Sequence, residues 1–207
     1  MADFSKHKAA QASSTKQLAD AARKVGVRAL ASSTLVLAEK AVTAALSSTT
    51  EVALGEAARD LQQIRHDPAF IDALETDLTQ SQEAVEEQML EAMEEGLQSE
   101  MTWQVLQIRG LRWRMTDADR MLLSGYPVQG HTVREISKYM HDQLRYETLG
   151  LMASPLDGSA PLGSMQQTLG ALVTRFGDRT AGAAEEAYYA GVQLGMRLTA
   201  EAISNAG

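Results

Sequence analysis

The fold is decided by residues 67–101, DPAFIDALETDLTQSQEAVEEQMLEAMEEGLQSEM. Asp67 followed by Pro68 predicts a helix start, because aspartate is a favoured N-cap and proline fits the first helical turn. Apolar residues then recur at helical spacing, on one face: Ile71, Leu74, Leu78, Val85, Met89, Met93, Leu97 and Met101. We therefore expect one helix of about 25 to 40 residues, longer than most helices of globular proteins.

The chain before residue 67 contains no proline and also has a helical pattern. From about Ala9 to Ser47, small and apolar residues alternate four- and three-residue steps, the spacing of a narrow helix–helix seam. These seam positions are Leu18, Ala22, Val25, Ala29, Ser32 and Val36. Because alanine dominates the seam, we expect this helix to be stable only when it packs against another element.

Two capping boxes after the long helix predict shorter helices. Thr116 stands three residues before Asp119, and Thr132 stands three residues before Glu135. Glycine and proline between the two boxes predict a turn that includes Pro127 and Gly130. Further predicted elements are a loop over 154–163, a helix from Ser164 that Gly177 ends, and a last helix that Asp178 caps.

No segment of useful length alternates apolar and polar residues as a half-buried strand does. The sequence therefore predicts an all-α fold. We expect long antiparallel N-terminal helices to form an arm over residues 1–116. A smaller bundle of short helices is expected over residues 117–207.

Composition narrows the class of protein. Hydrophobic residues make up 44% of the 207 residues but aromatic residues only 5%, which suits closely packed, alanine-rich helices. A net charge of -8 argues against a protein that coats nucleic acid, since such proteins have a basic face. The chain has no cysteine, which excludes disulfides and thiol nucleophiles. No apolar run approaches the roughly 20 residues of a membrane span. We expect no secretory signal at residues 1–8, because no apolar stretch follows their charged start.

The residue patterns of enzymes and metal sites are missing from the sequence. No two of the four histidines stand at the i, i+4 spacing of a helix-borne metal site. The glutamates of residues 83–100 lack the histidine three positions on that ferritin-like di-metal sites use. Nucleophile elbows and glycine-rich phosphate loops are absent as well. We expect no catalytic residue, no bound metal and no cofactor.

Two stretches are candidates for binding other proteins. Residues 83–100 contain seven glutamates and no basic residue. They predict either a solvated helix face or an acidic stripe that meets a basic partner. Trp103 and Trp113 flank two arginines, and tryptophan and arginine are enriched in protein interfaces, although the same pairing also binds single-stranded nucleic acid. The acidic chain favours a protein partner, and Trp103 has the alternative of a place in the core. The interface candidates are Glu87, Glu91, Glu94, Trp103, Arg109, Arg112 and Trp113.

Residues 122–135, LLSGYPVQGHTVRE, resemble the opening of the minor head protein domain of tailed bacteriophages, called the Mu-F-like head morphogenesis domain. Members share a Pro-apolar-x-Gly-x-Thr-apolar-x-Glu/Asp run, which matches Pro127, Gly130, Thr132 and Glu135 here. Gly163-Ser164-Met165 corresponds to a second glycine turn, and Arg179-Thr180 with Ala183-Ala184 to the last helix. The resemblance covers about residues 118–203. Ile136 and Ala181 stand where the family often has an aromatic residue and a glutamate.

The resemblance implies a structural protein of the phage virion. Such a protein associates with the portal or other head proteins in several copies, inside the head or at the portal vertex, after assembly in the host cytoplasm. Contact with nucleic acid is not indicated. One alternative is an internal virion ejection protein or helical effector that meets a membrane during delivery. Another is a small all-α enzyme with a carboxylate-bound metal.

Overall fold

A computed structural model of the protein describes residues 2–30, 66–108, 116–153 and 162–205. These residues form α1 (Ala2–Leu30), α4 (Pro68–Ile108), α5 (Asp117–Ser124), α6 (Val133–Ala153) and α7 (Leu162–Ser204). Extended pairing in the described residues is limited to one isolated bridge between Val128 and His131. The all-α prediction is confirmed.

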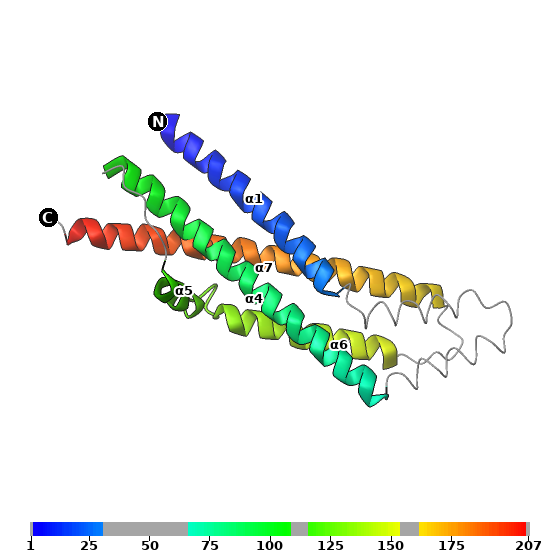
Figure 1. Ribbon diagram of the computed structural model, residues 1–207. Helices are drawn as coiled ribbons and strands as arrows, with labels where there is room; N and C mark the ends of the chain where they lie inside the picture. The colour runs from blue at the N-terminus through cyan, green and yellow to red at the C-terminus, as the bar shows by residue number, and fades with distance from the viewer. Residues whose placement is uncertain (1, 31–65, 109–115, 154–161, 206–207) are drawn as a thin grey trace, which may run out of the picture.

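The helices lie lengthwise against one another in an elongated bundle (Figure 1). The long helices α4 and α7 run in the same direction and cross near the middle of the bundle, and they form the largest contact in the described residues. The helix α1 runs antiparallel to both and packs on both. The helix α6, also antiparallel, packs mainly on α4, and the short α5 packs on α4 next to the start of α6.

The long helix predicted from Asp67 is confirmed as α4. It begins at Pro68, where the Ala69 amide donates to Asp67 Oδ1 over 3.0 Å, and it is 41 residues long. The buried face contains the predicted apolar residues Leu74, Leu78, Val85, Met89, Met93 and Leu97, all at most 2% exposed. The 3.6-residue period of the sequence therefore identified the side of α4 that faces the core.

The first helix differs from its predicted limits, because α1 begins at Ala2 and not near Ala9. Ala22 is fully buried in the core and Leu18 packs against it. Gly26, one position from the predicted seam residue Val25, is the glycine that meets α7. The prediction for residues 31–47 lies outside the described residues, as do residues 154–161 of the predicted loop over 154–163. The last two residues of that loop prediction are wrong, because Leu162 and Gly163 belong to α7.

The prediction of two helices divided at Gly177 is wrong, since α7 is continuous for 43 residues. A Cβ atom at Gly177 would lie 2.7 Å from Val27 Cγ2, and one at Gly26 would lie 2.5 Å from Thr180 Oγ1. Gly177 thus permits α1 to approach α7 closely. In the sequence, a glycine at this position fits either the end of a helix or a close contact between two helices. Asp178 accepts a hydrogen bond of 2.8 Å from Arg23 Nε on α1.

Buried residues on either side of residue 116 belong to one hydrophobic core. Leu123, Met140 and Leu144 of the later helices join it, as do Phe176 and Tyr188 of α7. The division of the chain into an arm and a smaller domain stays a prediction. In the described residues α7 packs mostly against helices of the predicted arm.

Candidate interaction surface

The helix α5 is held by its ends and by one buried side chain. At its start the Thr116 amide donates to Asp119 Oδ2 over 2.8 Å, and the Asp119 amide donates to Thr116 Oγ1 over 3.3 Å. The Thr116 hydroxyl also donates to Asp119 Oδ2, over 2.7 Å, and this bond lowers the pKa of Asp119 most, followed by the bond from the Thr116 amide. Arg120 Nη2 then reaches Glu87 Oε1 of α4 over 2.6 Å, and Leu123 is buried. The predicted capping box is therefore formed, while Arg120 and the buried Leu123 attach α5 to the rest of the bundle.

The chain between α5 and α6 is a tight turn with two left-handed residues. Gln129 has φ 51° and Gly130 has φ 89°. The Val128 amide donates to the His131 carbonyl over 2.7 Å, and the His131 amide donates back over 3.1 Å. Paired positive φ values at the two central residues are typical of a hairpin turn. The buried Val128 side chain anchors this turn to the core.

The second capping box starts α6 directly after the turn. The Thr132 amide donates to Glu135 Oε2 over 2.8 Å, and the Glu135 amide donates to Thr132 Oγ1 over 3.3 Å. The bond from the Thr132 amide is the main reason that the pKa of Glu135 is lowered, and nearby His131 lowers it further. The residues that carry the family resemblance thus build the turn and the first turn of α6.

A groove of about 310 Å³ lies between α5, the turn and the C-terminal half of α7. Its lining includes three buried residues, Leu97, Leu123 and Leu194. Leu122 and Leu198 also line it and remain 75% and 36% exposed. Because the lining is mostly apolar and open to solvent, the groove suits the side chains of a binding partner.

The charged groups at this groove are not equivalent. The Asp119 carboxylate is occupied by its two bonds with Thr116. The Arg197 guanidinium lies 5.5 Å from the centroid of the Tyr126 ring, in cation–π contact. Its ion pair with Glu201, at 3.7 Å, joins two side chains that are about 60% exposed, and such pairs contribute little. Arg197 is therefore the charged group at the groove that can bind an incoming anion.

Further apolar side chains are exposed outside the groove lining, and those on α7 lie on the side of that helix away from Leu194 and Leu198. Met121, next to the lining residue Leu122, is 78% exposed. On α7, Tyr189, Met196 and Ile203 are each about half exposed and stand seven residues apart, so they share one side of the helix. Exposed apolar residues that gather in one region commonly mark a binding surface.

The acidic stretch predicted from the sequence lies along α4 (Pro68–Ile108). Glu83, Glu87, Glu91 and Glu95 are exposed at four-residue intervals, which places them in one row. Glu87 pairs with Arg120 of α5. Glu91 accepts from Gln88 over 2.8 Å, and Glu94 accepts from Gln98 over 2.9 Å, both on the same helix. Glu87 thus contacts α5 through an ion pair, while Glu91 and Glu94 make contacts only within α4 among the described residues.

The interface candidate Trp103 contacts α1. Its ring stacks on His7, with centroids 4.7 Å apart and planes at 25°. His7 Nε2 lies 3.3 Å from Glu100 Oε2, and Glu100 is 4% exposed. Gln11 and Gln104 donate to the same carboxylate over 3.4 and 2.8 Å. Trp103 therefore belongs to a cluster that joins α1 to α4. The other candidates of that stretch, Arg109, Arg112 and Trp113, lie outside the described residues.

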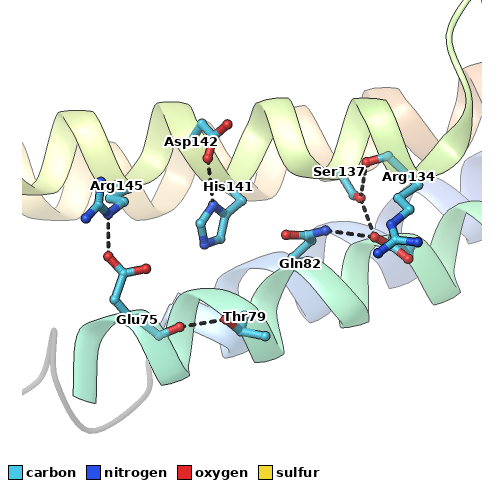
Figure 2. A network of polar contacts seen from close by, with 9 residues as sticks. Glu75, Thr79, Gln82, Arg134, Ser137, His141, Asp142 and Arg145 are labelled. Carbon is cyan, nitrogen blue, oxygen red and sulfur yellow. Dashed lines mark hydrogen bonds and ion pairs between the residues drawn. The ribbon is translucent and has the colours of Figure 1, made fainter. Parts of the chain in front are cut away.

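A second set of polar contacts joins α4 to α6 (Figure 2). Ser137 Oγ and Gln82 Nε2 both donate to Glu86 Oε1, over 2.8 and 2.9 Å. Arg145 pairs with Glu75 at the other end of this contact (Figure 2).

Ser137 and His141 of this network are residue types found in hydrolases, but their bonds here are structural. Ser137 Oγ lies 3.0 Å from the Arg134 carbonyl as well as near Glu86, and His141 Nδ1 lies 3.1 Å from Asp142 Oδ1 (Figure 2). A histidine that activates a serine must reach its hydroxyl, and these bonds direct the two side chains to other groups. The network therefore holds α6 in register on α4.

Within the described residues, no three histidine or acidic side chains come together in a way that would hold a metal ion. None of the described helices is long and apolar enough to cross a membrane. Comparison with known proteins gave no match to a family model, to a curated protein or to a solved structure.

The sequence did not reveal the groove or the role of Arg197. The groove depends on residues from α4, α5 and α7, which are up to about one hundred positions apart. The seven-residue recurrence of Tyr189, Met196 and Ile203 marks a second apolar side on α7, but this side faces away from the groove-lining Leu194 and Leu198, so it did not identify the groove. A second apolar side on an already packed helix indicates another contact.

Proposed function

We propose that the protein is a structural component of the head of a tailed bacteriophage, of the minor head or portal-associated kind. It acts in several copies through protein–protein contacts, inside the head or at the portal vertex. The observation that carries this proposal is the exposed apolar groove between α5 and α7, together with the segment that forms its wall. That segment is part of the run that resembles the minor head domain, since Tyr126 and Pro127 line the groove.

The chemistry of this surface supports a protein partner. Its exposed apolar side chains are Met121 and Leu122 of α5 and Leu198 of α7, and the groove lining adds Tyr126 and Arg197. Aromatic residues, methionine and arginine are enriched in the buried centres of protein interfaces. The acidic row of α4 supplies a charged surface that steers a basic partner.

The test is coexpression with the portal protein and the other head proteins encoded in the same genome. We expect a stable complex that contains several copies of this chain, measured by native mass spectrometry. Leu122→Asp, at the edge of the groove, should weaken the complex at least tenfold. Tyr146→Asp is the matched control, because Tyr146 is 80% exposed on α6 and does not line the groove. A protein that binds none of these head proteins would refute the proposal.

A further inference from the structure

We propose that the groove between α5 and α7 binds α5 of a second copy of this chain, so that two copies pair around a two-fold axis. Met121 of each copy enters the groove of the other, and Asp117 of each copy pairs with Arg197 of the other. This inference rests on the proposed function in one respect, the presence of several copies, and names the partner at this surface.

The groove defines what its occupant must carry. Leu97, Leu123 and Leu194 require an apolar side chain, because polar groups placed against them would lose their bonds with water. Arg197 can pair with a carboxylate or similar anion of the occupant, since its existing contacts are a cation–π contact and one long, exposed ion pair. An occupant that carries an acidic and an apolar group close together therefore complements the groove.

The outer side of α5 carries this combination. Asp117 and Met121 are four residues apart on one helix, so their Cβ atoms lie about 6 Å apart on the same side. Met121 is 78% exposed, and Asp117 is exposed as well. Asp117 takes no part in the capping box, which uses Asp119, and it forms no ion pair within the described residues. Both groups are free to bind outside the molecule.

The position of this side of α5 favours a reciprocal contact. Met121 is adjacent to Leu122, which lines the groove, so the inserting residue and the receiving groove lie next to each other on one surface. Two-fold contacts require such an arrangement, because the same patch must both give and receive. In such a contact the patches of both copies are used, so a third copy cannot add through the same surface.

Sedimentation velocity of the full chain over a range of concentrations tests the pairing. We expect the unmodified chain to form dimers, and Met121→Asp to raise the dimer dissociation constant at least tenfold. Tyr146→Asp, an equally exposed position away from the groove, should leave the constant unchanged. Circular dichroism melts of each variant separate lost pairing from lost folding.

A charge exchange tests the proposed ion pair directly. Asp117→Arg and Arg197→Asp should each weaken the dimer about tenfold, because each puts like charges opposite one another. The chain that carries both substitutions restores the pair with the signs reversed and should recover most of the affinity. No recovery in the double variant, in chains that remain folded, would overturn the pairing of Asp117 with Arg197.

Two further outcomes would overturn the pairing as a whole. One is a chain that stays monomeric at several hundred micromolar. The other is a dimer that is indifferent to Met121→Asp and to both charge variants, since it would use a different surface. If the chain is monomeric but Leu122→Asp still abolishes binding to the portal, another protein occupies the groove. In that case the second-copy inference fails and the proposed function stands.

Discussion

The crossing of α4 with α7 and the turn between α5 and α6 reach defined geometries by opposite means. At the crossing, a Cβ at Gly96 would lie 2.1 Å from the Tyr188 carbonyl oxygen, and one at Gly191 would lie 2.0 Å from that of Met93. At the turn, a Cβ at Gly130 would meet nothing within 4 Å, yet its φ is 89°. Gly96 and Gly191 are needed because the crossing leaves no space for a side chain. Gly130 is needed because its backbone has a positive φ.

This difference determines how far a substitution acts. A side chain at the crossing must push two long helices apart, because the obstructing atoms are main-chain atoms that cannot rotate away. A side chain at the turn strains two or three residues and leaves the bundle packed. The comparison predicts large losses of stability at the crossing and smaller, local losses at the turn.

The largest effect is expected for Gly191→Ala. Its new methyl group has no room against the Met93 carbonyl, so the free energy of unfolding should fall by about 3 kcal/mol. Gly182→Ala is the control on the same helix, because a Cβ there meets nothing within 4 Å. The control should gain about 0.5 to 1 kcal/mol from helix propensity. Urea unfolding that gives both variants the same stability would show that α4 and α7 do not cross this closely.

Gly130→Val should be the next most damaging change. A β-branched residue is strained at positive φ, and the free energy of unfolding should fall by about 2 kcal/mol. Gly130→Asn should lose less, because asparagine adopts positive φ more readily. Equal losses for valine and asparagine would mean that side-chain volume and not backbone conformation matters at this position.

Thr132→Ala tests the local bonds of the turn region. The substitution removes the hydroxyl that accepts from the Glu135 amide, and N-cap losses of this kind cost about 1 kcal/mol. Thr132→Ser keeps the hydroxyl and should retain most of the stability. Hydrogen exchange should increase in the first turn of α6 and stay unchanged at the α4–α7 crossing. Faster exchange throughout the bundle would contradict the local character of this cap.

The smallest effect concerns pH. The pKa of Glu135 is lowered from 4.5 on folding, so its ionised form stabilises the folded state. That contribution is complete above the unfolded pKa and is lost as the pH falls through the lower folded pKa. The stability difference between the unmodified chain and Glu135→Gln should therefore shrink as the pH falls below 4.5. Thermal melts of both chains between pH 6 and pH 3 measure this difference. A difference that stays constant would mean that the charge of Glu135 does not contribute to the stability of the folded state.

The sequence predicted well wherever neighbouring residues determine the structure. The start of α4 at Pro68 follows from a local N-cap, and both capping boxes follow from a threonine three residues before a carboxylate. The turn that contains Gly130 follows from the glycine and proline between the two boxes, and the structure shows that its φ is positive. The buried face of α4 follows from the helical period, because that period repeats within a few residues.

Other features were decided only when distant segments came together. Gly177 has the pattern of a helix end, but the approach of α1 to α7 gives the same glycine a place inside a helix. For Trp103 the sequence left an interface and the core as alternatives. Its ring stacks on that of His7, which lies 96 positions away on α1. The groove and its Arg197 exist only because α4, α5 and α7 meet there.

The sequence by itself determined that this chain is helical, where several helices start and which face of α4 is buried. These features depend on hydrogen bonds and periodicity within a few residues, which the order of residues contains directly. The tertiary structure alone decided the continuous α7, the close helix crossing and the exposed groove. Contacts between helices depend on how closely two backbones approach. A glycine or an apolar residue is compatible with several such arrangements, so its role is defined only by the neighbour that packs against it.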